Sequence, residues 1–299
     1  MNEDTLQIAP EVASAINDNK PVVALESTVI AHGLPRPLNL ETARRLEAIV
    51  REGGATPATI AIIDGKLCAG LTEEQLSLLG EGSDVKKVSS RDLALAVARR
   101  WTGATTVAST IWIAGKVGIK VFATGGIGGV HRGALPDVSA DLPELARSRM
   151  IVVCSGAKIV LDLPATREWL ETHGVTVLGY ECDELPAFYS RKSGLPVDAC
   201  VDSPDEVAEI FRTQRRLGIS RALLVTAPVP EEFELPSEQL KFVLDNALAD
   251  AARKNSGGRD LTPFLLNTMA QLSRGNTLRA NVALLENNAR IAAQIAGAI

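Results

Sequence analysis

The chain has 299 residues, of which 46% are hydrophobic and 22% are charged, and its formal net charge is −5. A globular chain of this length and composition buries enough surface to fold without disulfide bonds. The acidic balance argues against a nucleic acid as partner, because proteins that bind duplexes usually present a basic face.

The cysteines and the N-terminus predict a cytoplasmic protein with free thiols. None of the four cysteines belongs to a C-x-x-C pair or has the spacing of a zinc site. The first ten residues, MNEDTLQIAP, are acidic where a secretory signal is basic. No apolar run approaches the length that spans a membrane, so no membrane partner is expected.

Apolar, β-rich runs alternate with helical patterns along the chain. In chain order the predicted elements are a strand at 22–25, a helix at 44–51, a hairpin at 59–67, a helix at 92–101, strands at 119–123 and 151–154, a helix at 159–172, strands at 175–178 and 222–225, and helices at 240–253 and 278–295. Asp64-Gly65 favours the tight turn of the hairpin. Pro164 predicts a break or restart within its helix.

This order of elements predicts an α/β fold, a three-layer α/β/α sandwich with a largely parallel central sheet plus a hairpin. No long linker, low-complexity segment or internal repeat divides the chain, so residues 1–299 are expected to form one domain. Ligands of such sheets bind beyond the carboxyl ends of the strands. We therefore expect the site at the glycine-rich segments that follow the strands at 119–123 and 151–154.

The segment Thr124–Gly133 has five glycines in ten residues. Glycine lets backbone N–H groups approach an anion closely, so a phosphate monoester is the ligand best suited to this segment. The alternative is a flexible turn without a ligand. The segment is not a Walker loop, since no Gly-Lys-Ser/Thr follows, and it lacks a clear dinucleotide fingerprint opening a helix.

Two carboxylates stand four residues apart at Asp137 and Asp141, and they lie on one face if this segment is a helical turn. With Ser139 they offer hard oxygen ligands for a divalent ion such as Mg²⁺ or Mn²⁺. The alternative is an N-cap beside a solvated acid.

Lys158 and Glu26 each stand just beyond a predicted buried strand. A desolvated lysine can lose its proton near neutral pH and form an imine with a carbonyl. A carboxyl group partly out of water has a raised pKa and can act as an acid. The alternatives are a surface lysine at a helix start and a solvated strand terminus. Lys87, in the polar run before the helix at 92–101, is a possible anion contact.

Taken in order, these segments resemble the pseudouridine-5'-phosphate glycosidase (pseudouridylate synthase) family. The matching motifs span nearly the whole chain and are ALESTVIAHGLPRP (24–37), GATPATIAIIDGKLCAGL (54–71), KVSSRDL (87–93), GATTVAST (103–110), FATGGIGGVHRGA (122–134), DVSADL (137–142), CSGAKIVLDLPAT (154–166), GYECDELPAF (179–188) and TPFLLN (262–267). The segment 134–136 is one residue shorter than in other members.

The resemblance implies an enzyme that reversibly cleaves pseudouridine 5'-phosphate with water to uracil and ribose 5-phosphate. It implies Lys158 as nucleophile, Glu26 as proton donor, and Asp137 as ligand of one Mn²⁺ per subunit, with Mg²⁺ as an alternative. The substrate-binding positions that it implies are Lys87, Val107, Ser139, Ala140, Asp141 and Asn281. To these we add Thr124, Gly125 and Gly126 as expected phosphate contacts, and the resemblance also implies a homotrimer.

The bond to be cleaved joins two carbon atoms, so the acid-catalysed route of ordinary glycosidases lacks a good leaving group. An imine between Lys158 and C1' of the opened sugar would supply an electron sink for that cleavage. This chemistry explains why a lysine and an acid would stand together in the site.

Two other functions are considered: an NAD(P)-dependent oxidoreductase with a dinucleotide at 124–129, and a non-catalytic phosphosugar-binding protein. The first requires an acidic residue at the end of the next strand, where Ser155-Gly156 stands instead. The second has no reason to carry Glu26 and Lys158 together at strand ends.

Overall fold

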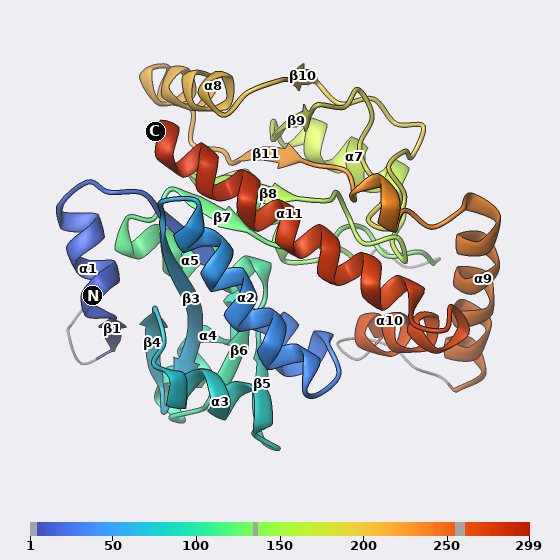
Figure 1. The fold of residues 1–299 in the computed structure, drawn as a ribbon, viewed down its shortest axis with the longest axis horizontal. Helices are drawn as coiled ribbons and strands as arrows, with labels where there is room; N and C mark the ends of the chain where they lie inside the picture. Colours follow the sequence, from blue (N-terminus) through green and yellow to red (C-terminus); the bar gives the residue numbers. More distant parts are fainter. Residues whose placement is uncertain (1–4, 134–136, 255–260) are drawn as a thin grey trace.

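The computed structural model describes residues 5–133, 137–254 and 261–299, and its strands form one continuous sheet (Figure 1). The larger part of the sheet has the strand order β3-β2-β7-β8-β11-β9-β10, and every pairing within it is parallel. Its strands are β2 (Val22–Leu25), β3 (Thr56–Ile63), β7 (Val121–Ala123), β8 (Ile151–Cys154), β9 (Thr176–Tyr180), β10 (Ala199–Val201) and β11 (Leu223–Thr226). Parallel neighbours need crossover connections, which the alternation of strands and helices along the chain supplies.

The second half of β3 extends past β2 into a smaller mixed part of the sheet. There β3 pairs antiparallel with β4 and β6, β1 pairs parallel with β4, and β5 pairs parallel with β6. The strands that β3 joins here are β1 (Leu6–Ile8), β4 (Lys66–Ala69), β5 (Lys86–Val88) and β6 (Gly103–Thr105). Asp64 and Gly65 both have positive φ, 49° and 77°, as a tight hairpin turn requires, so the predicted hairpin is confirmed.

Helices cover both faces of the sheet, which confirms the predicted three-layer α/β/α arrangement (Figure 1). One face carries α11, which crosses β2, β7 and β8 and packs against α2 and α8. The opposite face carries α5, which packs on β2, β3 and β4 and contacts α6, and α7, which packs on β9. These helices are α2 (Leu38–Glu52), α5 (Val107–Val117), α6 (Asp141–Arg147), α7 (Leu163–Thr172), α8 (Pro204–Arg216) and α11 (Asn276–Ala298).

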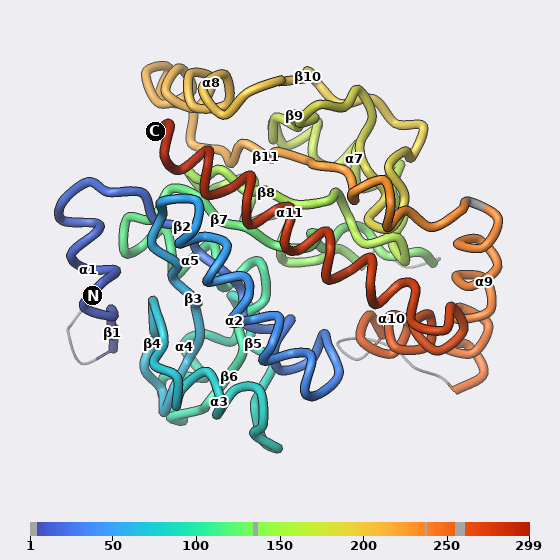
Figure 2. The backbone as a smooth tube through the Cα atoms, in the orientation of Figure 1, coloured from blue at the N-terminus to red at the C-terminus, as the bar shows by residue number. Residues whose placement is uncertain are grey.

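The remaining helices lie at the ends and edges of the sheet. Helix α1 and the C-terminal end of α11 lie toward one end of the molecule, and α9 and α10 pack together at the other (Figure 2). The bounds are α1 (Pro10–Asn17), η1 (Val29–Gly33), α3 (Glu73–Glu81), η2 (Ser90–Asp92), α4 (Leu93–Ala98), η3 (Glu231–Phe233), α9 (Ser237–Arg253) and α10 (Leu261–Leu272). Within the described part of the chain, no helix is long and apolar enough to cross a membrane.

All the predicted helices differ from the structure in their bounds. The helix predicted at 44–51 is α2, which begins six residues earlier at Leu38, and those predicted at 240–253 and 278–295 begin three and two residues earlier. The helix predicted at 159–172 begins only at Leu163, because Pro164 fits the first turn of a helix but not its interior. Asp162 caps it by accepting a hydrogen bond from the backbone N–H of Ala165. The helix predicted at 92–101 is a short 3₁₀ turn, Ser90–Asp92, followed by α4.

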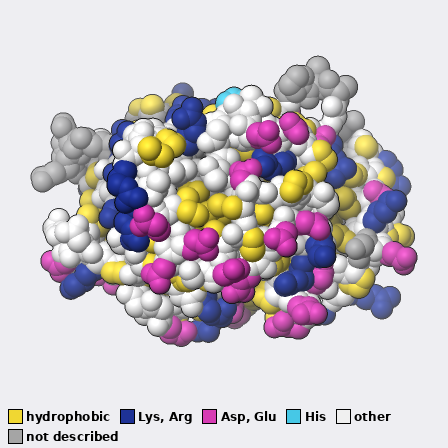
Figure 3. All heavy atoms as spheres, turned by 90° about the horizontal axis from the view of Figure 1, so that it is seen from above, with side chains coloured by type: hydrophobic (Ala, Val, Ile, Leu, Met, Phe, Trp, Pro, Cys, Tyr) yellow, Lys and Arg dark blue, Asp and Glu magenta, His cyan; other side chains and the backbone are white. Residues whose placement is uncertain are grey.

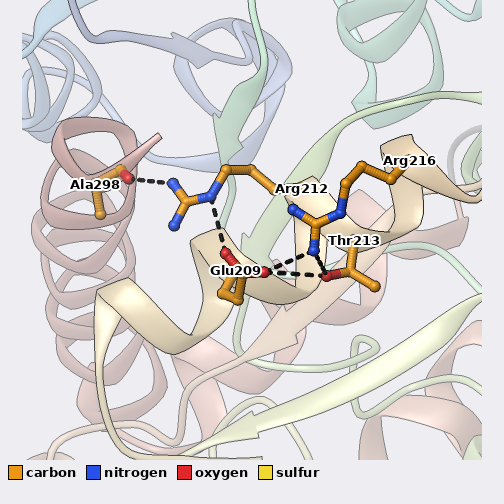
Figure 4. Close-up of polar contacts among 5 residues, drawn as sticks. All are labelled: Glu209, Arg212, Thr213, Arg216 and Ala298. Carbon is orange, nitrogen blue, oxygen red and sulfur yellow. Dashed lines mark hydrogen bonds and ion pairs between the residues drawn. The ribbon is translucent and has the colours of Figure 1, made fainter.

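The C-terminal end of α11 is fixed to α8 (Figure 4). Arg212 donates one hydrogen bond to the carbonyl of Ala298 at 2.9 Å and another to Glu209 at 3.2 Å. Glu209 also accepts from Arg216 at 2.8 Å and from Thr213 at 3.3 Å. Since the last carbonyls of a helix lack partners within it, Arg212 satisfies one of them and anchors the helix that crosses the sheet.

The surface on the side of α8 mixes charges of both signs. In Figure 3, acidic and basic side chains are interspersed on this face with small apolar areas between them. Such mixing is what a composition of 31 basic and 36 acidic residues predicts for a globular protein.

Candidate active site

A cavity of about 470 Å³ opens where β2, β7 and β8 end, at the edge of the sheet where the sequence predicted a site. It brings together residues far apart in the sequence. The predicted site residues that line it are Glu26, Lys87, Val107, Gly125, Gly126, Asp137, Ser139, Ala140, Asp141, Lys158 and Asn281. Thr124 does not line the cavity, but it is hydrogen-bonded to Glu26, which does.

Glu26 and Thr124 follow neighbouring strands, β2 and β7, which explains why they meet. The Thr124 hydroxyl donates a hydrogen bond to the Glu26 carboxylate. Burial raises the pKa of Glu26, and the nearby Asp141 carboxylate raises it further, while the Lys158 charge, the Thr124 hydrogen bond and Lys87 oppose the rise. Desolvation therefore prevails at this carboxyl group, as expected for a group that must carry a proton.

Lys158 lies on a backbone segment that runs beside the glycine-rich segment. Its N–H donates to the carbonyl of Ile127 at 3.1 Å, and its Nζ donates to the carbonyl of Gly126 at 2.7 Å. Gly156 makes this path possible, because its φ is +81° and a Cβ there would lie 2.0 Å from the carbonyl oxygen of Pro186. The strand end thus carries the lysine into the cavity with its Nζ directed to a backbone carbonyl.

Asp141 fastens the glycine-rich segment to α5. Its carboxylate accepts hydrogen bonds from the N–H of Ala108 at 2.9 Å and from the N–H of Gly128 at 2.7 Å. The fit around Gly128 is close, since a Cβ there would lie 2.2 Å from the Ser139 hydroxyl and 2.7 Å from the Asp141 carboxylate. Asp141 is 6% exposed, and both of its oxygens are engaged with backbone groups.

The segment from Asp137 to Asp141 is not a helical turn. Val138 forms an antiparallel bridge with Val130, the N–H of His131 donates to the carbonyl of Asp137, and Ser139 donates to Gly129. These pairings use the backbone groups that a helix would need, so α6 begins only at Asp141. The two carboxylates are therefore not a face-sharing pair: Asp141 is buried and Asp137 is exposed at the rim of the cavity.

The surroundings of Asp137 decide how a divalent ion could bind. Within residues 5–133, 137–254 and 261–299, no three His, Cys, Asp or Glu side chains come together as a ligand set. Mg²⁺ and Mn²⁺ are nevertheless often held by one or two carboxylates, with waters and substrate oxygens completing the shell. One exposed carboxylate at the mouth of the cavity fits an ion of this kind. The neighbouring segment 134–136 lies outside the described residues.

Lys87 and Val107 lie on the side of the cavity formed by β5 and the start of α5. Ser109 and the N–H of Thr106 both bond to the carbonyl of Val88, at 2.6 and 3.0 Å, and so hold β5 beside the N-terminus of α5. The positive end of a helix and a lysine side chain together favour an anion.

Asn281 reaches the opposite side of the cavity from α11. It is 7% exposed, and no hydrogen bond joins its side-chain amide to another described residue. Buried amides are nearly always hydrogen-bonded, so this one is suited to bind a ligand. Apolar residues that were not predicted as site residues also line the cavity, namely Pro263, Leu266 and Leu285, and Phe188 lies against Gly126.

Comparison with known proteins identifies the family. The family model of indigoidine synthase A-like proteins matches residues 11–298. A pseudouridine-5'-phosphate glycosidase of Geobacillus kaustophilus is 51% identical over 295 residues, which are 98% of each chain. Another, of Alkaliphilus metalliredigens, is 49% identical over 299 residues, 99% of this chain and 97% of the relative. The chain belongs to the indigoidine synthase A-like family. The resemblance inferred from the motifs is thus confirmed.

Two solved structures share this fold. An indigoidine synthase A-like protein of Thermotoga maritima has a TM-score of 0.89 and 39% identity, over 98% of this chain and 95% of its own. The prealnumycin C-glycosynthase AlnA, solved in complex with ribulose 5-phosphate, has a TM-score of 0.91 and 37% identity, over 99% of this chain and 97% of its own.

Proposed function

We propose that this protein reversibly cleaves the carbon–carbon glycosidic bond of pseudouridine 5'-phosphate, giving uracil and ribose 5-phosphate. The observation that carries the proposal is the meeting of Lys158 and Glu26 in one cavity, where the carboxyl pKa is raised by burial. Relatives named as pseudouridine-5'-phosphate glycosidases match the chain over nearly its full length. A C-glycosynthase of the same fold that holds a pentose phosphate also supports it.

Each group has a defined task in the reaction. The Lys158 amine bonds to C1' as the ring oxygen leaves, and Glu26 donates the proton that this oxygen takes up. The bound nitrogen, which now carries a positive charge, returns a proton to the Glu26 carboxylate. The electron pair of the C1'–C5 bond then passes to the uracil carbon, which takes up that proton, while the lysine nitrogen forms a double bond to C1'. Water adds to this imine, releases ribose 5-phosphate as the aldehyde and returns the free amine.

The attack requires an uncharged amine and a fixed direction of approach. The Gly126 carbonyl accepts a hydrogen bond from Nζ, which directs the nitrogen without adding a negative charge beside it. The Asp141 carboxylate, whose charge acts on Glu26, has both oxygens bound to backbone N–H groups. Its task is therefore to hold the segment that carries the Gly126 carbonyl.

The remaining contacts divide between the phosphate, the base and a metal ion. Lys87 and the N-terminus of α5 at Val107, with Gly125 and Gly126, are suited to the 5'-phosphate, whereas Thr124, which does not line the cavity, is withdrawn as a phosphate contact. The side-chain amide of Asn281, to which no described side chain or backbone group is hydrogen-bonded, is suited to the uracil edge. Asp137 would hold one Mn²⁺, or Mg²⁺ in its place, which when bound supplies positive charge to orient water and substrate oxygens.

We also propose where the enzyme acts, how it assembles and which process it serves. It acts in the cytoplasm as a homotrimer in which residues 1–299 form one catalytic domain, and it serves pseudouridine breakdown.

One assay tests the proposal against its two rivals. Pseudouridine 5'-phosphate is added with Mn²⁺, and uracil is quantified by chromatography together with the change in absorbance. Release of uracil and ribose 5-phosphate in equal amounts is expected. A protein that releases no uracil but binds NAD(P), or that binds ribose 5-phosphate without turnover, would contradict the proposal. The structure gives the dinucleotide alternative no support, because the glycines at 124–129 lead into an extended segment and not into a helix.

A further inference from the structure

One face of α11 connects the base side of the cavity with the strand ends. Asn281, Leu284, Leu285 and Asn288 are spaced three and four residues apart, so they lie along the same side of the helix. Leu284 and Leu285 pack directly on Gly125, where a Cβ would lie 3.1 Å and 3.2 Å from their methyl groups. The glycine thus lets the helix approach the backbone that follows β7.

Asn288 enters this junction as a fully buried amide. Its Nδ2 donates to the carbonyl of Thr124 at 2.9 Å and contacts the carbonyl of Gly125 at 3.5 Å. Its amide also bonds to the Ser155 hydroxyl, with atoms at 3.1 Å and 3.3 Å. Both Asn288 and Ser155 are 0% exposed. A single side chain therefore links the ends of β7 and β8.

The groups fixed by Asn288 are those next to the catalytic pair. Thr124, whose carbonyl it holds, donates its hydroxyl to Glu26. Gly126, two residues further on, accepts the Nζ of Lys158 at 2.7 Å. A rotation of the peptide groups at 124–126 would move both contacts together, because the same short backbone carries them.

We propose that Asn288 is a positioning residue, which sets the relative orientation of Glu26 and Lys158 through the backbone at 124–126. It does not line the cavity, so it acts through these groups and not on the substrate. The inference rests on the proposed function, since it assigns Asn288 to the geometry of that reaction. Small misplacements of reacting groups are costly even when substrate binding is retained.

The first variant is Asn288→Ala, compared with Thr226→Val as a matched control. Thr226 is also fully buried, and its hydroxyl bonds to the carbonyl of Leu178 at 2.9 Å in the same sheet, away from the cavity. For Asn288→Ala we expect kcat to fall by about 10- to 100-fold with KM changed by less than about threefold. Thr226→Val should lower the melting temperature while kcat stays close to wild type.

The pH profile of activity distinguishes a positioning role of Asn288 from a purely structural one, because loss of stability alone would not shift the profile. The Thr124 hydrogen bond lowers the pKa of Glu26, so a weaker bond should shift the alkaline limb of activity to higher pH. Thr124→Val should produce the same shift. If Asn288 acts through Thr124, the double variant should show a shift no larger than that of Thr124→Val alone.

Turnover is expressed per reactive site, which is counted by borohydride trapping of Lys158 with ribose 5-phosphate. The inference is overturned if Asn288→Ala leaves the turnover per trapped site unchanged. It is also overturned if the pH shifts caused by Asn288→Ala and Thr124→Val simply add in the double variant. The trapping rate also separates the two hypotheses. A wild-type protein that traps ribose 5-phosphate at Lys158 but releases no uracil contradicts the proposed reaction. The inference about Asn288 is then tested by trapping alone: it holds if Asn288→Ala traps ribose 5-phosphate more slowly than the wild type, and it fails if the two trapping rates are equal.

Discussion

The floor and the rim of the cavity are built in different ways. On the floor, Glu26 and Lys158 follow parallel strands, and each has a hydrogen-bond partner inside the protein. At the rim, Asp137 is exposed on an extended segment. Covalent chemistry needs groups that are fixed and shielded from water, whereas a metal ion that keeps its own waters can be held at an open edge.

Asp137 and Asp141, only four residues apart in the sequence, differ in the same way as the rim and the floor of the cavity. Asp141 is buried and bonded to the backbone at Ala108 and Gly128, so it is part of the framework of the floor. Asp137 belongs to the rim. Substitutions on the floor should therefore reduce catalysis severely, and those at the rim should mainly alter the response to metal.

The largest effect is expected for Lys158→Ala. Without the amine no imine can form, so activity should fall by at least about 10³-fold. The side chain's Nζ contact is to the Gly126 carbonyl, so circular dichroism and the melting temperature should stay close to wild type. Lys20→Ala, at a surface lysine paired with Asp18, is the control and should retain activity. Comparable activity in the two variants would remove Lys158 from the mechanism.

Glu26→Gln should lower activity by about 10²- to 10⁴-fold, because the amide has no acidic proton to transfer to the substrate. In the wild type, burial raises the pKa of Glu26, so the protonated acid persists to higher pH and activity is lost as pH rises through that pKa. The variant should lack this alkaline limb. A pH profile of kcat that keeps the limb in Glu26→Gln would assign it to another group.

Gly128→Ala tests the framework between floor and rim. The added methyl group would meet Ser139 and Asp141 at 2.2 and 2.7 Å, so the segment must shift, at a cost of about 1–3 kcal/mol in the free energy of unfolding. We expect activity to fall by about 10²-fold, since the Gly126 carbonyl moves with the segment. Gly115→Ala is the matched control: nothing lies within 4 Å of a Cβ there, and alanine should stabilise α5 by about 0.5–1 kcal/mol. Equal melting temperatures and activities in the two variants would contradict the account.

The smallest change in stability is expected for Asp137→Ala. Its side chain is exposed at the rim, so the melting temperature should not move. Stimulation of activity by Mn²⁺ should fall by about tenfold or more. Asp84→Ala, at an exposed surface carboxylate, serves as the control. A titration of activity with Mn²⁺ that is the same in both variants would show that the ion binds elsewhere.

The strands that end at the cavity could be predicted because their sequences are continuous apolar runs followed by polar or glycine residues. The bounds of β2 and β8 agree with the predicted 22–25 and 151–154. Glu26 and Lys158 could be singled out because each is a charge just beyond such a run. Helix α5 could not be predicted from the sequence, because Val107–Val117 is apolar on nearly every side and its apolar residues show no helical period.

Contacts between distant segments could not be predicted from one sequence. Asp141 binds backbone groups 33 and 13 residues away, and Asn288 binds Thr124 at a separation of 164 residues. The only local signal was a polar Asn288 beside the apolar stripe of the last helix, which is unusual for a buried face.

The most direct test of the floor is to trap the imine. The protein is incubated with ribose 5-phosphate and borohydride, digested, and its peptides are examined by mass spectrometry. A reduced pentose phosphate adduct on Lys158, absent from Lys158→Ala, is the predicted result. An adduct on another lysine, or uracil release without any adduct, would contradict the account.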